Sequence, residues 1–275
     1  MHNRIRKPSF SELQRFGRNR RHFLSDGLIG HWLMNERVGD TAFDSSDSRN
    51  HGTLINMPYG AWTAGREDNG TLDFNGVNNY VNMGDINRLA MSWSIGAWIK
   101  TPNSLPTTNR IIIARSGGSP LWSQNYILLV NYSETPDSFG VGSSADNYIR
   151  ARSATVPASG RWYHLVGTFD SVSKVYTIYV DGKSDGTATG TALPPTDANQ
   201  IFQIGASDGS AAPANWFSGF IDNIRIYNRA LSADEVWELY INPYSDFRIQ
   251  SELWNIGISG AVPTLHYYQK LMAGN

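Results

Sequence analysis

The chain has 275 residues, among them 26 glycines and nine tryptophans, and its formal net charge at pH 7 is −1. It contains no cysteine, which excludes disulfides, thiolate metal sites and cysteine nucleophiles. No apolar run approaches the ~18 residues of a membrane span, and the N-terminus lacks the apolar segment of a secretory signal.

The first 25 residues form a basic segment. They contain one acidic side chain, Glu12, and seven basic ones: Arg4, Arg6, Lys7, Arg15, Arg18, Arg20 and Arg21. The segment therefore carries +6, and the rest of the chain carries −7. A charge asymmetry of this kind is typical of a tail that binds a partner. The alternative is a solvated, disordered terminus, which is the commoner state of short basic tails.

Short apolar runs separated by Gly, Asn, Asp and Pro predict a series of strands after residue 26. The runs lie at 27–34, 71–84, 92–100, 110–116, 125–132, 147–153, 161–170, 174–183, 200–207 and 219–228. In the third run, one face carries Trp93, Ile95, Ala97 and Ile99. The eighth ends in Asp181-Gly182, a hairpin signal. Closely spaced strands without intervening helices indicate an antiparallel sandwich or barrel.

One helix is predicted after the last strand. Ser232 and Glu235 have the spacing of a capping box, and Val236, Leu239 and Tyr240 then share one face. Since Pro243 ends this helix, we divide the chain into an N-terminal arm (1–25), one domain (26–241) and a C-terminal arm (242–275). Disordered tails are poor in aromatic residues, so we expect the C-terminal arm to dock, either on its own domain or on a partner.

Six stretches, taken in order, resemble the LamG-like jelly-roll domains of the concanavalin A-like lectin/glucanase type. They are "DTAFDSSDSRNHGTL", "LDFNGVNNYVNMG", "SWSIGAWIK", "GRWYHLVGTFD", "YTIYVDGK" and "FSGFIDNIRIYNRALSADEVWELY". The resemblance covers roughly residues 27–241 and leaves both arms outside. It implies an all-β antiparallel jelly-roll sandwich with one short C-terminal helix. The chain departs from the family at Asp47, Ser48 and Arg49, where relatives usually have Gly-Asn-Gly.

The resemblance also implies a structural Ca²⁺ site, which many relatives build from the Asp-x-Ser loop and an aspartate of the last strand. Here the ligands would be Asp44, Ser46, Asn50 and Asp222. Alternation within 219–228 puts Asp222 on the expected core face, and a buried carboxylate requires a cation or several donors. Oxygen ligands in a loop suit Ca²⁺. The alternative is that amides of a turn bind the Asp222 carboxylate and no metal is held.

Catalytic motifs are missing from the sequence. Retaining glucanases with this fold carry a Glu-x-Asp-x-x-Glu strand, which sets an acid and a nucleophile about 5 Å apart, and no such stretch occurs here. The histidines lack the H-x-x-x-H spacing of a zinc site. There is neither a Gly-x-Ser-x-Gly elbow nor a phosphate loop. We therefore expect that the chain is not an enzyme.

Sugar binding is compatible with the sequence. Lectin sites combine an aromatic platform with Asn or Asp side chains on loops, and the candidates here are Asn78, Asn79, Tyr80, Asn215 and Trp216. The alternative for each aromatic residue is packing in the core of the sandwich.

The two arms suggest an assembly. Arginines in an extended arm can bind carboxylates through two hydrogen bonds. LamG-like domains with short tails resemble components of phage particles. The resemblance therefore implies a structural protein on the capsid surface of a virion, such as a capsid decoration protein of a phage, whose arms bind the capsid or another virion protein. Its oligomeric state is left open. The contacts would come from the seven basic residues of the N-terminal arm and from Phe247, Trp254, Tyr267 and Tyr268.

Two alternatives accompany this expectation. The first is a carbohydrate-binding adhesin or receptor-binding protein of the tail-fibre kind. The second is an arm that binds nucleic-acid phosphates, which we rank below binding to a protein surface.

Overall fold

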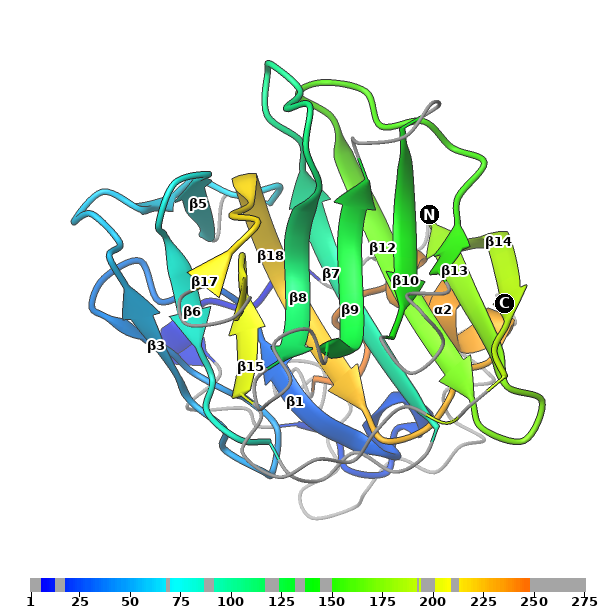
Figure 1. Cartoon of the computed structure of the whole chain (residues 1–275). Coiled ribbons are helices and arrows are strands. Elements are labelled where there is room, and N and C mark those ends of the chain that lie inside the picture. Colours follow the sequence, from blue (N-terminus) through cyan, green and yellow to red (C-terminus); the bar gives the residue numbers. More distant parts are fainter. Residues whose placement is uncertain are drawn as a thin grey trace, which may run out of the picture.

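Two antiparallel sheets packed face to face make up the molecule (Figure 1). This computed structural model describes residues 6–12, 18–67, 70–86, 92–116, 124–131, 137–143, 150–191, 193, 201–208 and 213–247. The predicted all-β sandwich with one short C-terminal helix is confirmed. The helices in the described ranges are too short or too polar to span a membrane.

The first sheet has the order β14-β13-β12-β7-β18-β5-β4, and β1 also pairs with β18. Its strands are β1 (Leu28–Trp32), β4 (Trp62–Thr63), β5 (Thr71–Asn75), β7 (Trp93–Lys100), β12 (Trp162–Asp170), β13 (Val175–Val180), β14 (Lys183–Thr189) and β18 (Ser218–Tyr227). The long strand β18 connects two parts of this sheet. Its first half pairs with β5, and its second half pairs with β1.

The second sheet has the order β11-β10-β9-β8-β15-β6-β3-β2. Its strands are β2 (Thr41–Ala42), β3 (Gly52–Ile55), β6 (Tyr80–Asn82), β8 (Arg110–Ser116), β9 (Gln124–Asn131), β10 (Ser138–Gly142), β11 (Arg150–Arg152) and β15 (Ile201–Ile204). Strands β16 (Ser207–Asp208) and β17 (Pro213–Ala214) pair in a two-stranded sheet of their own, and β16 contacts β8 and β15 of the second sheet. Within the described ranges, the helical elements with complete bounds are η1 (Phe23–Ser25) and α2 (Ala233–Ile241), and residues 10–12 are also helical.

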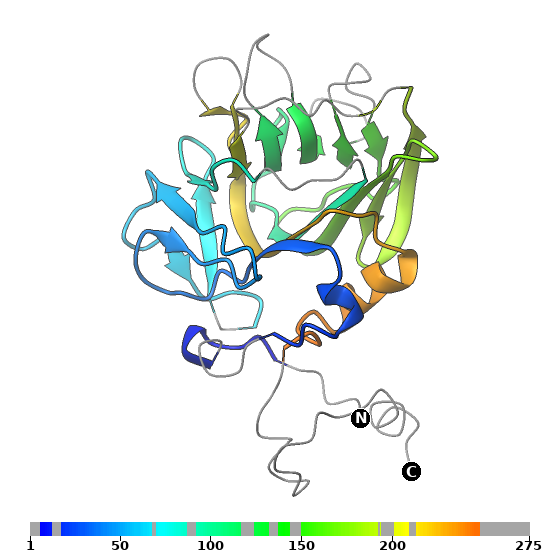
Figure 2. The same cartoon turned by 90° about the horizontal axis from the view of Figure 1, so that it is seen from below.

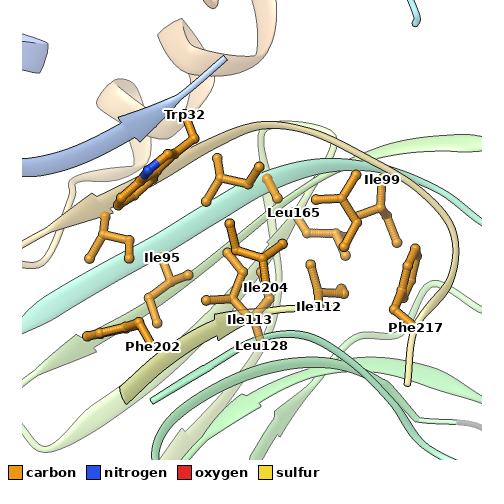
Figure 3. Close-up of a cluster of buried hydrophobic side chains, with 14 of the residues drawn as sticks. Trp32, Ile95, Ile99, Ile112, Ile113, Leu128, Leu165, Phe202, Ile204 and Phe217 are labelled. Atoms are coloured by element: carbon orange, nitrogen blue, oxygen red, sulfur yellow. The ribbon is translucent and has the colours of Figure 1, made fainter. Parts of the chain in front are cut away.

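The core lies between the sheets and is built by strand alternation. The predicted inward face of β7, which includes Trp93 and Ile95, belongs to the main hydrophobic cluster. Figure 3 shows side chains of this cluster, with Leu128, Phe202 and Ile204 of the second sheet among those labelled. Successive side chains of a strand point to opposite faces of the sheet. In β7 and β12 the outer face is covered as well, so nearly every residue of these strands is buried.

A second, smaller cluster covers the outer face of the first sheet. Helix α2 contributes Val236 and Leu239, and the N-terminal segment contributes Leu24 from η1. Figure 2 shows this N-terminal segment in blue beside α2 and the turn after it in orange. The capping box predicted at Ser232 and Glu235 is present.

A β-bulge in β18 changes the predicted position of Asp222. The pairing of β18 with β7 shifts register between Asp222 and Arg225, and Asn223 has a φ of 47°. Because a bulge inserts one residue, the alternation restarts after it. Ile221 and Ile224 therefore face the core, while Asp222 pairs with Trp98 on the outer face of the sheet. The expectation that Asp222 shares the core face was wrong, although its carboxylate is buried.

Strand β14 of the first sheet packs closely against β11 of the second at Gly186. A Cβ atom added to Gly186 would overlap the carbonyl oxygen of Arg152. We predict that Gly186→Ala lowers the free energy of unfolding by about 1–3 kcal/mol, the usual cost of overpacking. Gly60→Ala is the control, because a Cβ there meets no atom within 4 Å. Urea unfolding of both variants checks this, and equal midpoints would contradict it.

Candidate functional site

The Asp222 carboxylate is bound by a lysine from the N-terminal arm. Lys7 is fully buried, and its Nζ forms an ion pair with Asp222 Oδ1. The same Nζ donates hydrogen bonds to the carbonyl oxygens of Gly70 at 2.7 Å and Met34 at 3.4 Å. The cation that a buried carboxylate requires is therefore an ammonium group that the chain itself supplies.

Burial opposes the charge on both members of this pair. It raises the pKa of Asp222, against the influence of the charges of Lys7 and Arg66. It also lowers the pKa of Lys7, although the negative charges of Asp222, Glu36 and Glu67 favour the ammonium form. Each group therefore depends on the other to stay ionised.

Asp44 has different partners, all of them from its own neighbourhood. Its carboxylate accepts hydrogen bonds from the backbone N–H groups of His31, Ser46 and Asn50 at 2.7–2.8 Å, and from Ser46 Oγ at 2.8 Å. The side chain of Asn50 donates to the Ile29 carbonyl at 3.0 Å. The loop after β2 is thus held by backbone amide donors. This is the kind of contact given above as the alternative to a metal ion at Asp222.

These contacts do not fit a Ca²⁺ ion shared by Asp44 and Asp222. Both oxygens of Asp44 accept from N–H or O–H donors, and an ammonium group binds Asp222. Ca²⁺ requires six to eight oxygen ligands, and within the described ranges no three His, Cys, Asp or Glu residues form a metal-binding group.

A second buried carboxylate, Asp246, joins the N-terminal arm to the segment after α2. Arg225 of β18 binds Asp246 through both terminal nitrogens, at 2.9 and 3.0 Å. Arg18 forms an ion pair with the same carboxylate, and its guanidinium lies 5.1 Å from the Phe247 ring centroid. Arg18 and Phe247 also form an isolated β-bridge. Two guanidinium groups from distant parts of the chain therefore share one acid.

The charges around Asp246 shift the pKa values of its neighbours. Burial by itself would raise the pKa of Asp246, but Arg225 and Arg18 hold it well below the usual range. Burial, together with the same two arginines, lowers the pKa of His31 well below its usual value. His31 is therefore neutral at pH 7, and its Nε2 lies 2.6 Å from Asn223 Oδ1.

The arm residues that we predicted as partner contacts divide into three groups. Lys7, Arg18 and Phe247 are buried against the chain's own domain, so here the expectation is corrected. At the surface, Arg6 pairs with Glu12, Arg20 pairs with Asp47, and Arg21 is exposed. Arg4, Arg15, Trp254, Tyr267 and Tyr268 lie outside the described residues.

The aromatic residues predicted to bind sugar do lie together. Tyr80 begins β6 and Trp216 precedes β18, and their ring centroids are 5.7 Å apart at an interplanar angle of 52°. Both side chains are half-buried, while Asn78 and Asn215 beside them in sequence are exposed. We call these four residues the aromatic patch.

Two turns hold the aromatic patch in place. Asn215 has a φ of 54°, and its carbonyl accepts a hydrogen bond from the Ile111 amide of β8 at 2.9 Å. In the other turn, Asn75 Oδ1 accepts from the backbone amides of Val77 at 2.9 Å and Asn78 at 3.1 Å. Such Asx turns fix a loop without help from other elements.

Asn79 does not belong to the aromatic patch, which corrects its assignment as a ligand residue. Its side chain is buried, accepts from the Asn75 amide at 3.1 Å and donates to the Asn56 carbonyl. These bonds join the two turns that flank β3 and β6. Asn79 therefore has a structural role, because its amide is already used within the chain.

A family model described as the concanavalin A-like lectin/glucanases superfamily matches residues 47–237. The chain belongs to this superfamily. The predicted resemblance is therefore confirmed, and the two sheets described above are the sandwich that it implied. No curated protein matches the sequence.

Solved structures show the same fold. Domain 4 of an extracellular arabinanase from Geobacillus stearothermophilus, in complex with arabinotriose, aligns with a TM-score of 0.57 and 22% identity, over 78% of this chain and 98% of that one. Trypanosoma rangeli sialidase in complex with sialic acid aligns with a TM-score of 0.57 and 18% identity, over 80% of this chain and 33% of that one. This chain thus spans about a third of the sialidase.

We predict that Lys7→Met lowers the free energy of unfolding by about 3–5 kcal/mol, because it leaves the Asp222 carboxylate buried without its cation. The double variant Lys7→Met/Asp222→Leu should be more stable than Lys7→Met alone, since it removes both charges. Arg6→Met is the control at an exposed neighbouring position. Denaturant unfolding measures these three variants and the single variant Asp222→Leu. Additive losses from the two substitutions would contradict the pairing.

Glu36 should make stability depend on pH. Burial raises the pKa of Glu36 to about 7, against the hydrogen bond from the Phe43 amide and the charge of Lys7. Because the folded state then holds a proton that the unfolded state releases above its value of 4.5, stability falls as pH rises from about 4.5 to about 7. Glu36→Gln should remove up to about 3 kcal/mol of this fall. Denaturation at pH 4.5 and 7.5 tests this, and an unchanged slope in the variant would contradict it.

Proposed function

We propose that the chain is a carbohydrate-binding domain without hydrolase activity, and that the aromatic patch is its glycan site. The observation that carries this proposal is the pair of half-buried rings, Tyr80 and Trp216, beside the exposed side chains of Asn78 and Asn215.

The chemistry of the patch suits a sugar ring. An aromatic side chain offers an apolar face, against which the C–H groups of a sugar can pack. The Tyr hydroxyl, the Trp N–H and the Asn amides can donate or accept hydrogen bonds at the rim of such a face. Because turns and a ring contact fix these groups before binding, little conformational entropy is lost when a ligand arrives.

The comparisons support this class of ligand. Domain 4 of the arabinanase was solved with arabinotriose, and the sialidase with sialic acid. At this level of identity the likeness concerns the fold, so the identity of the sugar does not transfer to this chain. We therefore propose a glycan-binding surface, and the glycan array described below would identify the sugar.

The positions of the glutamates support a binding role over hydrolysis. Within the described ranges, Glu36 and Glu67 lie in loops near Lys7, and Glu235 and Glu238 lie on α2. A retaining glycosidase would place two carboxyl groups about 5 Å apart at the scissile bond. Glu36 instead accepts from the Phe43 amide, and Glu235 binds Arg229 and Ser232.

The capsid-decoration hypothesis has lost part of its basis. It relied on two arms that were free to reach a partner, and Lys7, Arg18 and Phe247 are buried against the chain's own domain. The arm residues outside the described ranges, together with exposed Arg20 and Arg21, are what still support it. Virion association stays a hypothesis, and we rank glycan binding above it.

We predict that Trp216→Ala or Tyr80→Ala weakens glycan binding at least about tenfold, because each removes part of the stacking face. Trp237→Ala is the control, since Trp237 is an exposed tryptophan on α2, away from the patch. A glycan array that includes arabino-oligosaccharides and sialylated glycans would identify the ligand, and calorimetry would give the affinities. Equal losses in all three variants would contradict the assignment.

We also predict that the chain releases no reducing sugar from any polysaccharide that it binds, because its sequence lacks the Glu-x-Asp-x-x-Glu strand that carries the acid and the nucleophile in retaining glucanases of this fold. A reducing-sugar assay over hours at pH 5 and 7 checks this. Saturable turnover that disappears when one Asp or Glu is replaced would show that the chain is a hydrolase.

A further inference from the structure

Residues 6–12 lie against the domain in the way that a bound peptide does. The Lys7 backbone N–H donates to Glu67 Oε2 at 3.0 Å, and the Pro8 carbonyl accepts from Asn35 Nδ2 at 2.7 Å. The Phe10 ring lies 5.0 Å from the Phe43 ring. Side chains of the domain thus bind the backbone of the segment at two points, while the Lys7 side chain enters a buried pocket.

The pocket is shaped around an ammonium group. An ammonium has three N–H donors, and three acceptors surround the Lys7 Nζ: Asp222 Oδ1 and the carbonyls of Met34 and Gly70. Both carbonyl residues have positive φ, 51° for Met34 and 95° for Gly70. Positive φ is unfavourable for a residue with a Cβ, and strain of this kind concentrates at binding sites.

Glycine at position 70 lets the two carbonyls approach one another. A Cβ at Gly70 would lie 2.9 Å from the Met34 carbonyl oxygen, so any other residue would push the two acceptors apart. Two acidic side chains, Asp222 and Glu67, add a negative field at the pocket, and Glu36 adds to it above its pKa of about 7. The pocket therefore favours a cation with three donors over a metal ion, which needs more oxygen ligands than these.

We propose that this surface is a peptide-binding site for a lysine that precedes a helical turn, and that residues 6–12 occupy it as a ligand in cis. The proposal does not depend on glycan binding, because the aromatic patch uses other residues. A lysine-bearing segment of the same chemistry, supplied in trans, should bind once the cis segment is displaced.

The test uses the full chain with Lys7→Glu, because a carboxylate at position 7 is repelled by Asp222 and Glu67. The probe is a labelled peptide with the sequence RKPSFSE, which copies residues 6–12. We expect saturable binding by fluorescence anisotropy, and at least about tenfold weaker binding of a peptide with norleucine in place of lysine. Wild type and Arg6→Glu should not bind, because Lys7 still fills their pocket.

Three results would overturn the proposal: no saturable binding to folded Lys7→Glu, equal binding of the two peptides, or displacement of the peptide by millimolar Ca²⁺. If Lys7→Glu does not fold, the test is the rate at which an acetylating reagent modifies each lysine of the wild-type chain. We then expect Lys7 to react at least about tenfold more slowly than exposed Lys183. Equal rates would show that the pocket does not hold the lysine.

Discussion

Two carboxylates on the outer face of the first sheet, Asp222 and Asp246, determine how residues 6–12, 18–25 and 242–247 pack. A buried carboxylate is unstable unless a cation or several donors reach it. Lys7 provides that cation for Asp222, and Arg18 and Arg225 provide it for Asp246. The N-terminal segment must therefore follow this face, and it covers the sheet together with α2 and the turn after it.

The β-bulge at Asn223 is what places these charges. Because of it, Asp222 and Arg225 leave the core side of β18, while Ile221 and Ile224 remain in the core. A buried ion pair adds little net stability compared with well-packed apolar residues, but breaking one is costly. The pairs are therefore better understood as fixing where the arms lie, while the hydrophobic core supplies most of the stability.

Whether a feature of this fold could be predicted from the sequence depends on how far apart in the chain its interacting residues lie. Strand alternation in β7 and the capping box at Ser232 are local patterns, so the sandwich and its helix could be predicted from sequence. The Lys7–Asp222 pair joins residues 215 positions apart, and no local pattern reports such a contact. The one local sign of the bulge is that Asp222-Asn223 interrupts the apolar alternation of β18. This sign does not say on which face of the sheet Asp222 lies.

In the candidate glycan site, too, local patterns could be predicted from the sequence and contacts between separate turns could not. The aromatic residues Tyr80 and Trp216 could be selected because each lies next to asparagine in a turn-rich stretch. The sequence could not predict which asparagines stay exposed. Asn79, for example, is buried by a contact with Asn56, a residue of a different turn. The residues missed by sequence reasoning, Arg225 and Asp246, left one signal: an arginine in an otherwise apolar strand needs an acid nearby.

The central claim is that residues 6–12, 18–25 and 242–247 belong to the structure of the domain, and hydrogen exchange at backbone amides tests it most directly. The Asn19 amide donates to the Asp246 carbonyl at 2.7 Å. In the wild-type chain, amides in 18–26 should therefore exchange orders of magnitude more slowly than in an unfolded peptide. Exchange of 18–26 at the unfolded rate, while β7 stays protected, would show that the arm is free and would contradict the account.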